Sequence, residues 1–170
     1  MSFDLKAPKA LPKKLYKLLR LAVEDAKKIS KMKGYELYMG DWVEVAKESC
    51  EAPTCRVCMA GAVMVCEFKA DKTKRIHDEI EMYGVGALEP NDYGDSTGAK
   101  LFAINDMRTG DFVEAYEQLY GHGPNDGEVD ELLRKCGDFI SGRYDDATLV
   151  CRAPWRDYMT VANWLEKANV

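Results

Sequence analysis

The chain has 170 residues, of which 46% are hydrophobic and 31% charged, with six cysteines and a net charge of −5. This balance is that of one globular domain with a core, and it excludes a disordered chain, a disulfide scaffold and a membrane span, since the longest apolar run covers only Val57 to Cys66. No continuous apolar stretch marks a secretory signal near the N-terminus, so we expect a soluble cytoplasmic protein whose thiols stay reduced.

The N-terminal part of the chain predicts a lead-in followed by an amphipathic helix. Residues 1–10 are expected to be a flexible lead-in, and residues 11–170 a single helical domain. From Lys13 the apolar residues recur at helical spacing, and Gly34 ends the pattern. The apolar face consists of Leu15, Leu18, Leu19, Ala22, Val23, Ala26 and Ile29.

Charge divides the chain into a basic segment and an acidic remainder. Residues 1–33 carry ten basic and three acidic side chains, whereas residues 34–170 carry fourteen basic and twenty-six acidic ones. The basic face of the first helix predicts binding through Lys13, Lys14, Lys17 and Arg20, with nucleic acid as one candidate ligand of residues 13–31. The alternative, which we favour because only Tyr16 interleaves the basic residues, is a helix docked on its own acidic body. That acidic body is itself suited to a basic partner.

The next two segments are also predicted to be helical. Asp41 and Glu44 form a capping-box pattern that predicts a helix over residues 42–49. Pro53 and Thr54 then mark the start of a third helix, which is apolar all round over residues 57–66. A helix of that kind is buried on all sides, so we expect it at the centre of the fold.

Capping residues and a proline predict the remaining helices. They are Asp71, Ser96 or Thr97, Asp111 with Glu114, Asn125 with Glu128, and Pro154. Residues 84–98 predict a glycine-rich loop, and residues 147–152 a short strand without a clear partner. The sequence therefore predicts an all-α domain of seven or eight short helices around the buried helix 57–66.

Four of the six cysteines lie between Cys50 and Cys66, and this cluster allows four interpretations. Cys50, Cys55 and Cys58 are candidate zinc ligands, although structural zinc sites pair two CxxC turns and this chain has one. The same CxxC at the start of a helix is typical of a redox pair. We favour a third interpretation for most of these thiols, in which they fill space in the core.

A catalytic thiol is the remaining alternative for this cluster. Cys55 or Cys58 can be a nucleophile at a helix N-terminus, with His122 as its base in a cysteine-dependent hydrolase of the amidase or peptidase kind. His77 is the second candidate base. The chain shows no Walker, EF-hand or His-Glu-x-x-His motif, and we predict no cofactor.

The segment of residues 35–66 resembles a group of small phage- and prophage-encoded proteins that carry no assigned activity. The resemblance consists of an aromatic, Met and Trp segment followed by a C-x-A-G helix start: Tyr38, Met39 and Trp42, then Cys58, Ala60 and Gly61. Cys55 departs from the pattern of the group, which has a Gly-Thr pair and wider cysteine spacing there. The resemblance implies a phage origin and a helical fold. With the charge division, it leads us to predict a non-enzymatic protein that binds a host or phage macromolecule, with a protein as the expected partner.

Overall fold

The computed structural model describes residues 10–37, 43–46, 54–68, 97–145, 150–151 and 155–170. This part of the chain forms six helices and two small sheets, so the predicted helical domain is confirmed. The predicted lead-in and the helix expected after Asp71 lie outside the described residues.

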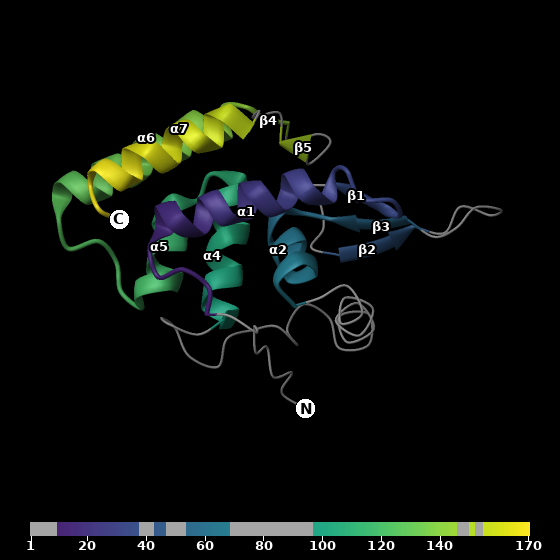
Figure 1. Cartoon of the computed structure of the whole chain (residues 1–170). Helices are drawn as coiled ribbons and strands as arrows, with labels where there is room; N and C mark the ends of the chain where they lie inside the picture. The colour runs from purple at the N-terminus through teal and green to yellow at the C-terminus, as the bar shows by residue number, and fades with distance from the viewer. Residues whose placement is uncertain (1–9, 38–42, 47–53, 69–96, 146–149, 152–154) are drawn as a thin grey trace.

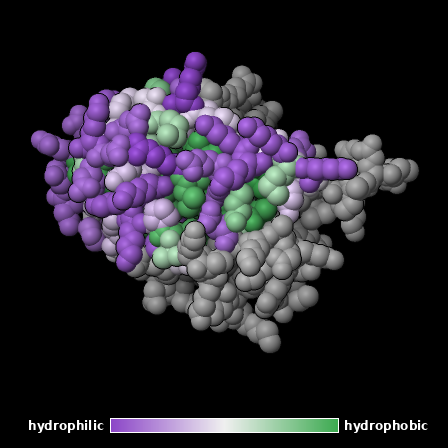
Figure 2. Space-filling view, viewed as in Figure 1, coloured by the Kyte–Doolittle hydropathy of each residue, from purple (hydrophilic) through white to green (hydrophobic). Residues whose placement is uncertain are grey.

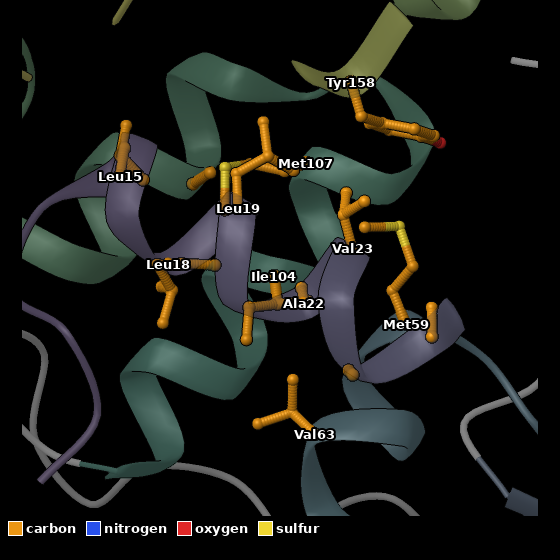
Figure 3. Packing of buried hydrophobic residues seen from close by; sticks show 14 of the residues in the cluster. Leu15, Leu18, Leu19, Ala22, Val23, Met59, Val63, Ile104, Met107 and Tyr158 are labelled. Atoms are coloured by element: carbon orange, nitrogen blue, oxygen red, sulfur yellow. The ribbon is translucent and has the colours of Figure 1, made fainter. Parts of the chain in front are cut away.

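Helix α1 (Leu15–Ile29) runs through the middle of the fold, as Figure 1 shows, and contacts α2, α4 and α7. Its apolar face is completely buried, as the helical spacing predicted. Figure 3 shows Leu19 beside Met107 of α4 (Thr97–Thr109) and Val23 near Met59. Burying a leucine side chain contributes about 1.5–3 kcal/mol, so this seam is a major part of the core.

Helix α2 (Met59–Phe68) is the predicted central helix. Residues 59–65 are buried, because α1 and α4 both pack against the helix. It begins two residues later than Val57, since the segment before it is a strand. The N–H of Ala62 donates to the carbonyl oxygen of Cys58 at 2.8 Å, which makes Cys58 the residue that precedes the first turn.

The helix predicted over residues 42–49 is wrong, because this segment contributes strand β2 (Val43–Ala46) to a small sheet. The sheet also contains β1 (Tyr35–Leu37) and β3 (Thr54–Val57), in the order β1-β3-β2. Strand β3 pairs parallel to β1 and antiparallel to β2. The valines of β2 alternate with Glu44, and this two-residue period of β-branched side chains outweighs the capping pattern at Asp41.

Helices α5 (Phe112–Tyr120) and α6 (Gly127–Ser141) follow α4 and pack against each other. Asp111 caps α5 as predicted, since its carboxylate accepts the N–H of Glu114 at 3.1 Å. The predicted cap of α6 is wrong by one residue. The Asp126 carboxylate, one position after Asn125, accepts the N–H of Glu128 at 2.8 Å.

The C-terminal part returns to α1. Strand β5 (Val150–Cys151) confirms the strand expected within residues 147–152 and pairs antiparallel with β4 (Tyr144–Asp145). Helix α7 (Trp155–Lys167) then packs along α1. Among the described helices, none combines the length and the apolar character that crossing a bilayer requires.

Candidate functional site

Two of the four basic residues predicted to bind a partner are bound to the C-terminal part of the chain instead. The Arg20 guanidinium donates to Asn163 Oδ1 and to Glu166 Oε2, both at 2.7 Å. Lys14 Nζ donates to the carbonyl oxygen of Asn169 at 2.8 Å. The Arg20 hydrogen bond lowers the pKa of Glu166. The basic face of α1 therefore serves, at these two positions, to hold α1 against α7.

The other two basic residues, Lys13 and Lys17, are exposed. Lys17 Nζ lies 5.8 Å from the centre of the Tyr16 ring, and Arg20 lies 5.4 Å from the same ring. Hydrophilic side chains cover most of the described surface on this side of the molecule (Figure 2). Lys17 and Arg20 therefore lie near the same aromatic ring, and Arg20 is in addition bound to α7.

The described cysteine thiols are shielded from solvent to different degrees. Cys58 and Cys136 are buried, and Cys66 is half-buried. Burial raises the pKa of the Cys58 thiol, and it raises the pKa of Cys66 to about 11 and that of Cys136 to about 12. A thiol with a raised pKa is protonated at neutral pH, so it is neither a nucleophile nor a metal ligand in this state. This environment matches the space-filling interpretation.

Of the predicted partners of Cys58, His122 is the one whose side chain the structure describes, and it lies away from Cys58. His122 is exposed on the α5–α6 connection, where its Nδ1 lies 2.8 Å from the carbonyl oxygen of Gly123. Figure 1 shows this connection well apart from α2. Cys55 lies in β3, and Cys50 and His77 lie outside the described residues. Within the part of the chain that the structure describes, no group of three His, Cys, Asp or Glu residues is placed to hold a metal ion.

A feature that our sequence analysis did not single out is an acidic groove along α6. Residues 111–138 contain eight acidic and two basic side chains. One hollow of about 540 Å³ lies on α6, and a second of about 320 Å³ lies between α6 and the start of α5. Arg134 and Asp138 line both, so the two hollows adjoin. We call them together the α6 groove. The first hollow is lined by Glu128, Glu131, Leu132, Arg134, Lys135 and Asp138.

Both cations of the α6 groove have neighbours that hold them. Arg134 Nε lies 2.9 Å from Asp130 Oδ2, which raises the pKa of this arginine. Lys135 Nζ lies 4.4 Å from the centre of the Trp164 ring, a cation–π contact between α6 and α7. Phe139 packs edge-on against the same ring at 5.1 Å. The groove therefore presents an excess of carboxylates on a helix that α7 holds in place.

The signal for this groove is present in the sequence. Glu128, Glu131 and Asp138 are three and seven residues apart, and this spacing places them on one side of a helix. The acidic groups of the outer face of α6 are a charge pattern in the sequence, and the hollow beside them forms where the start of α5 packs against α6.

A second unpredicted feature is the buried guanidinium of Arg108. Only 8% of this residue is exposed, yet its Nε and Nη1 atoms have no hydrogen-bond partner in the described part of the protein. Its positive charge acts to lower the pKa of Cys58, so it lies near the start of α2. Asp106, two residues earlier on α4, has a pKa raised to about 7 by burial and by the carboxylates of Glu114 and Asp111.

Comparisons with known proteins do not assign either feature. No protein-family profile, no curated protein and no solved structure matches this chain.

Proposed function

We propose that this protein is a non-enzymatic binding protein whose α6 groove receives a basic segment of a macromolecular partner. The observation that carries the proposal is the excess of exposed carboxylates along the groove, from Glu128 and Glu131 to Asp138. Lysine and arginine side chains of a partner would meet these groups, and complementary charge favours both the rate of encounter and the choice of partner.

The dimensions of α6 suit a short extended segment. A helix of 15 residues is about 22 Å long, which corresponds to about six residues of extended chain. The groove is also supported from behind, because Lys135 and Phe139 of α6 pack on Trp164 of α7. A surface held in this way loses little conformational freedom when a partner binds.

The origin and setting of the partner follow from the resemblance to small phage proteins. We propose that the protein is phage-encoded and acts in the host cytoplasm on a host or phage protein. The alternative function suggested by the charge division is nucleic-acid binding through the basic residues of segment 13–31. The bonds of Lys14 to Asn169 and of Arg20 to Glu166 of α7 weigh against it, because these cations already have partners within the chain.

A labelled deca-lysine peptide is the direct probe of the α6 groove. Its affinity is measured by fluorescence anisotropy for the wild-type protein and for the Glu131→Lys variant. Glu24→Lys is the matched control, because it makes the same change of charge at an exposed position of α1. We expect Glu131→Lys to weaken binding about tenfold, which corresponds to about 1.4 kcal/mol, and Glu24→Lys to have a much smaller effect.

Two outcomes would reject the groove as the binding site. One is equal weakening in both variants, which would show that the peptide responds only to net charge. The other is the absence of binding at low salt. A labelled DNA duplex tests the competing use: binding that Lys17→Glu abolishes and Glu131→Lys leaves unchanged would favour the basic face of α1.

A further inference from the structure

The start of α2 and the end of α4 bring two positive groups together in the interior. The first residues of α2 present the positive end of a helix dipole, with N–H groups that have no partner within the helix. The second positive group is the guanidinium of Arg108. Two positive groups in a poorly solvated place repel each other. Negative charge between them would lower the electrostatic free energy of the folded protein.

The backbone beside Arg108 is fixed from two sides. Tyr158 of α7 donates its hydroxyl to the carbonyl oxygen of Arg108 at 2.8 Å. Helix α4 also packs against α2. The residue is 8% exposed, and Nε and Nη1 lack a hydrogen-bond partner within the described part of the chain. A buried guanidinium with two unused N–H groups is costly unless an acceptor binds there.

Among the described residues, the acidic groups near Arg108 supply little negative charge. The Cys58 thiol lies against the N–H groups of Ala60 and Gly61, but burial raises its pKa and keeps it neutral. A neutral thiol is also a weak hydrogen-bond acceptor. The carboxyl of Asp106 interacts with the charge of Arg108, but its pKa of about 7 leaves it partly protonated at neutral pH.

We propose that a small tetrahedral oxyanion, with phosphate as the type case, binds between the Arg108 guanidinium and the N-terminus of α2. The guanidinium offers planar, paired N–H donors that match the oxygens of such an anion. The start of α2 adds favourable dipole potential, and the N–H groups of Ala60 and Gly61 there face only a neutral thiol. Because Arg108 is almost completely buried, the ligand is a small free anion and not the charged end of a large partner. This site is separate from the α6 groove.

Phosphate binding is tested by thermal unfolding and by equilibrium dialysis with radiolabelled inorganic phosphate. The wild-type protein is compared with Arg108→Met, which keeps a long side chain and removes the charge. Arg134→Met is the matched control, because Arg134 is an arginine already paired with Asp130 at the surface. Sodium sulfate and sodium chloride at equal ionic strength separate oxyanion binding from general salt effects.

We expect the melting temperature of the wild type and of Arg134→Met to rise with the logarithm of phosphate or sulfate concentration, since a ligand of the folded state stabilises it by mass action. Chloride should not reproduce this rise, and dialysis should give one phosphate per chain. Arg108→Met should lose both effects. In buffer without oxyanions it should be at least as stable as the wild type, because an uncompensated buried charge has been removed.

Three results would overturn the proposal. They are an equal rise with chloride, phosphate binding that survives in Arg108→Met, and a wild-type protein that binds no phosphate on dialysis. If Arg108→Met does not fold, Arg108→Lys decides. This variant keeps the charge but loses the planar donors, so unchanged phosphate affinity would reject the site and an affinity reduced about tenfold would support it.

Discussion

Replacing Gly137 with alanine tests how closely α6 approaches the α4–α5 turn, where the groove is built. A Cβ atom at Gly137 would stand 2.5 Å from the carbonyl oxygen of Gly110, which is a backbone atom and cannot rotate away. Gly110 itself has φ of +94°, a conformation that side chains disfavour. The turn and α6 must therefore separate to admit one methyl group.

The expected cost follows from two opposing effects. Overpacking costs about 1–3 kcal/mol, and the short contact with fixed backbone places this substitution near the upper end. Alanine in place of glycine within a helix returns about 1 kcal/mol. We therefore expect Gly137→Ala to lower the free energy of unfolding by about 2 kcal/mol, which moves the urea midpoint by about 1 M.

Urea unfolding followed by tryptophan fluorescence measures this change. Gly127→Ala is the control, because nothing lies within 4 Å of a Cβ atom at that position of the same helix. It should be neutral or slightly stabilising. If Gly137→Ala is as stable as the wild type or more stable, then α6 and the turn are not packed as closely as we describe, and the geometry of the 320 Å³ hollow between them is wrong.

Three further predictions concern charge and thiols. Burial raises the pKa of Asp25 to about 6, so the folded protein binds a proton that the unfolded chain releases, and stability should be lost as pH rises from about 4 to about 6. In urea titrations, the Asp25→Asn variant should lose less stability than the wild type over this pH interval. An equal loss in both proteins would contradict the assignment to Asp25. Arg20→Met should lower the urea midpoint at low salt by removing the bond to Glu166, and added salt should shrink the difference, whereas Lys17→Met should leave the midpoint unchanged. The Cys58 thiol should react with Ellman's reagent more slowly than free cysteine at neutral pH until urea unfolds the protein; a fast native reaction mapped to it by mass spectrometry would revive the hydrolase hypothesis.

The helical part of the fold was predictable because its signals are local. The apolar spacing from Leu15 to Ile29 places one face of α1 in the core without reference to any other segment. Asp111 and Gly121 likewise mark the ends of α5 through hydrogen bonds and a left-handed backbone conformation within a few residues. The stretch that forms α2 is apolar on all sides, so its composition alone predicts that it is buried.

The sheet was missed because its stability depends on partners distant in sequence. The segments Val43 to Ala46 and Thr54 to Val57 have only four residues each, so the alternation of valines with Glu44 is a weak signal, and each becomes a strand by pairing with the other. The candidate sites likewise depend on contacts between segments that are distant in sequence. Lys14 and Arg20 are basic residues in the sequence, and only the return of α7 along α1 gives them intramolecular partners.

The sequence by itself determined that this is a helical domain with a basic first helix, an apolar central helix and an acidic remainder, because composition and spacing along a helix set these properties locally. Tertiary structure alone decided which charged side chains are paired within the chain and which remain available to bind a partner. Packing against α7 engages Arg20, and the interior leaves two nitrogens of Arg108 without a described partner. The start of α5 packs beside α6 and forms one of the hollows that its acidic residues line. Desolvation and pairing depend on segments that meet only in the folded chain.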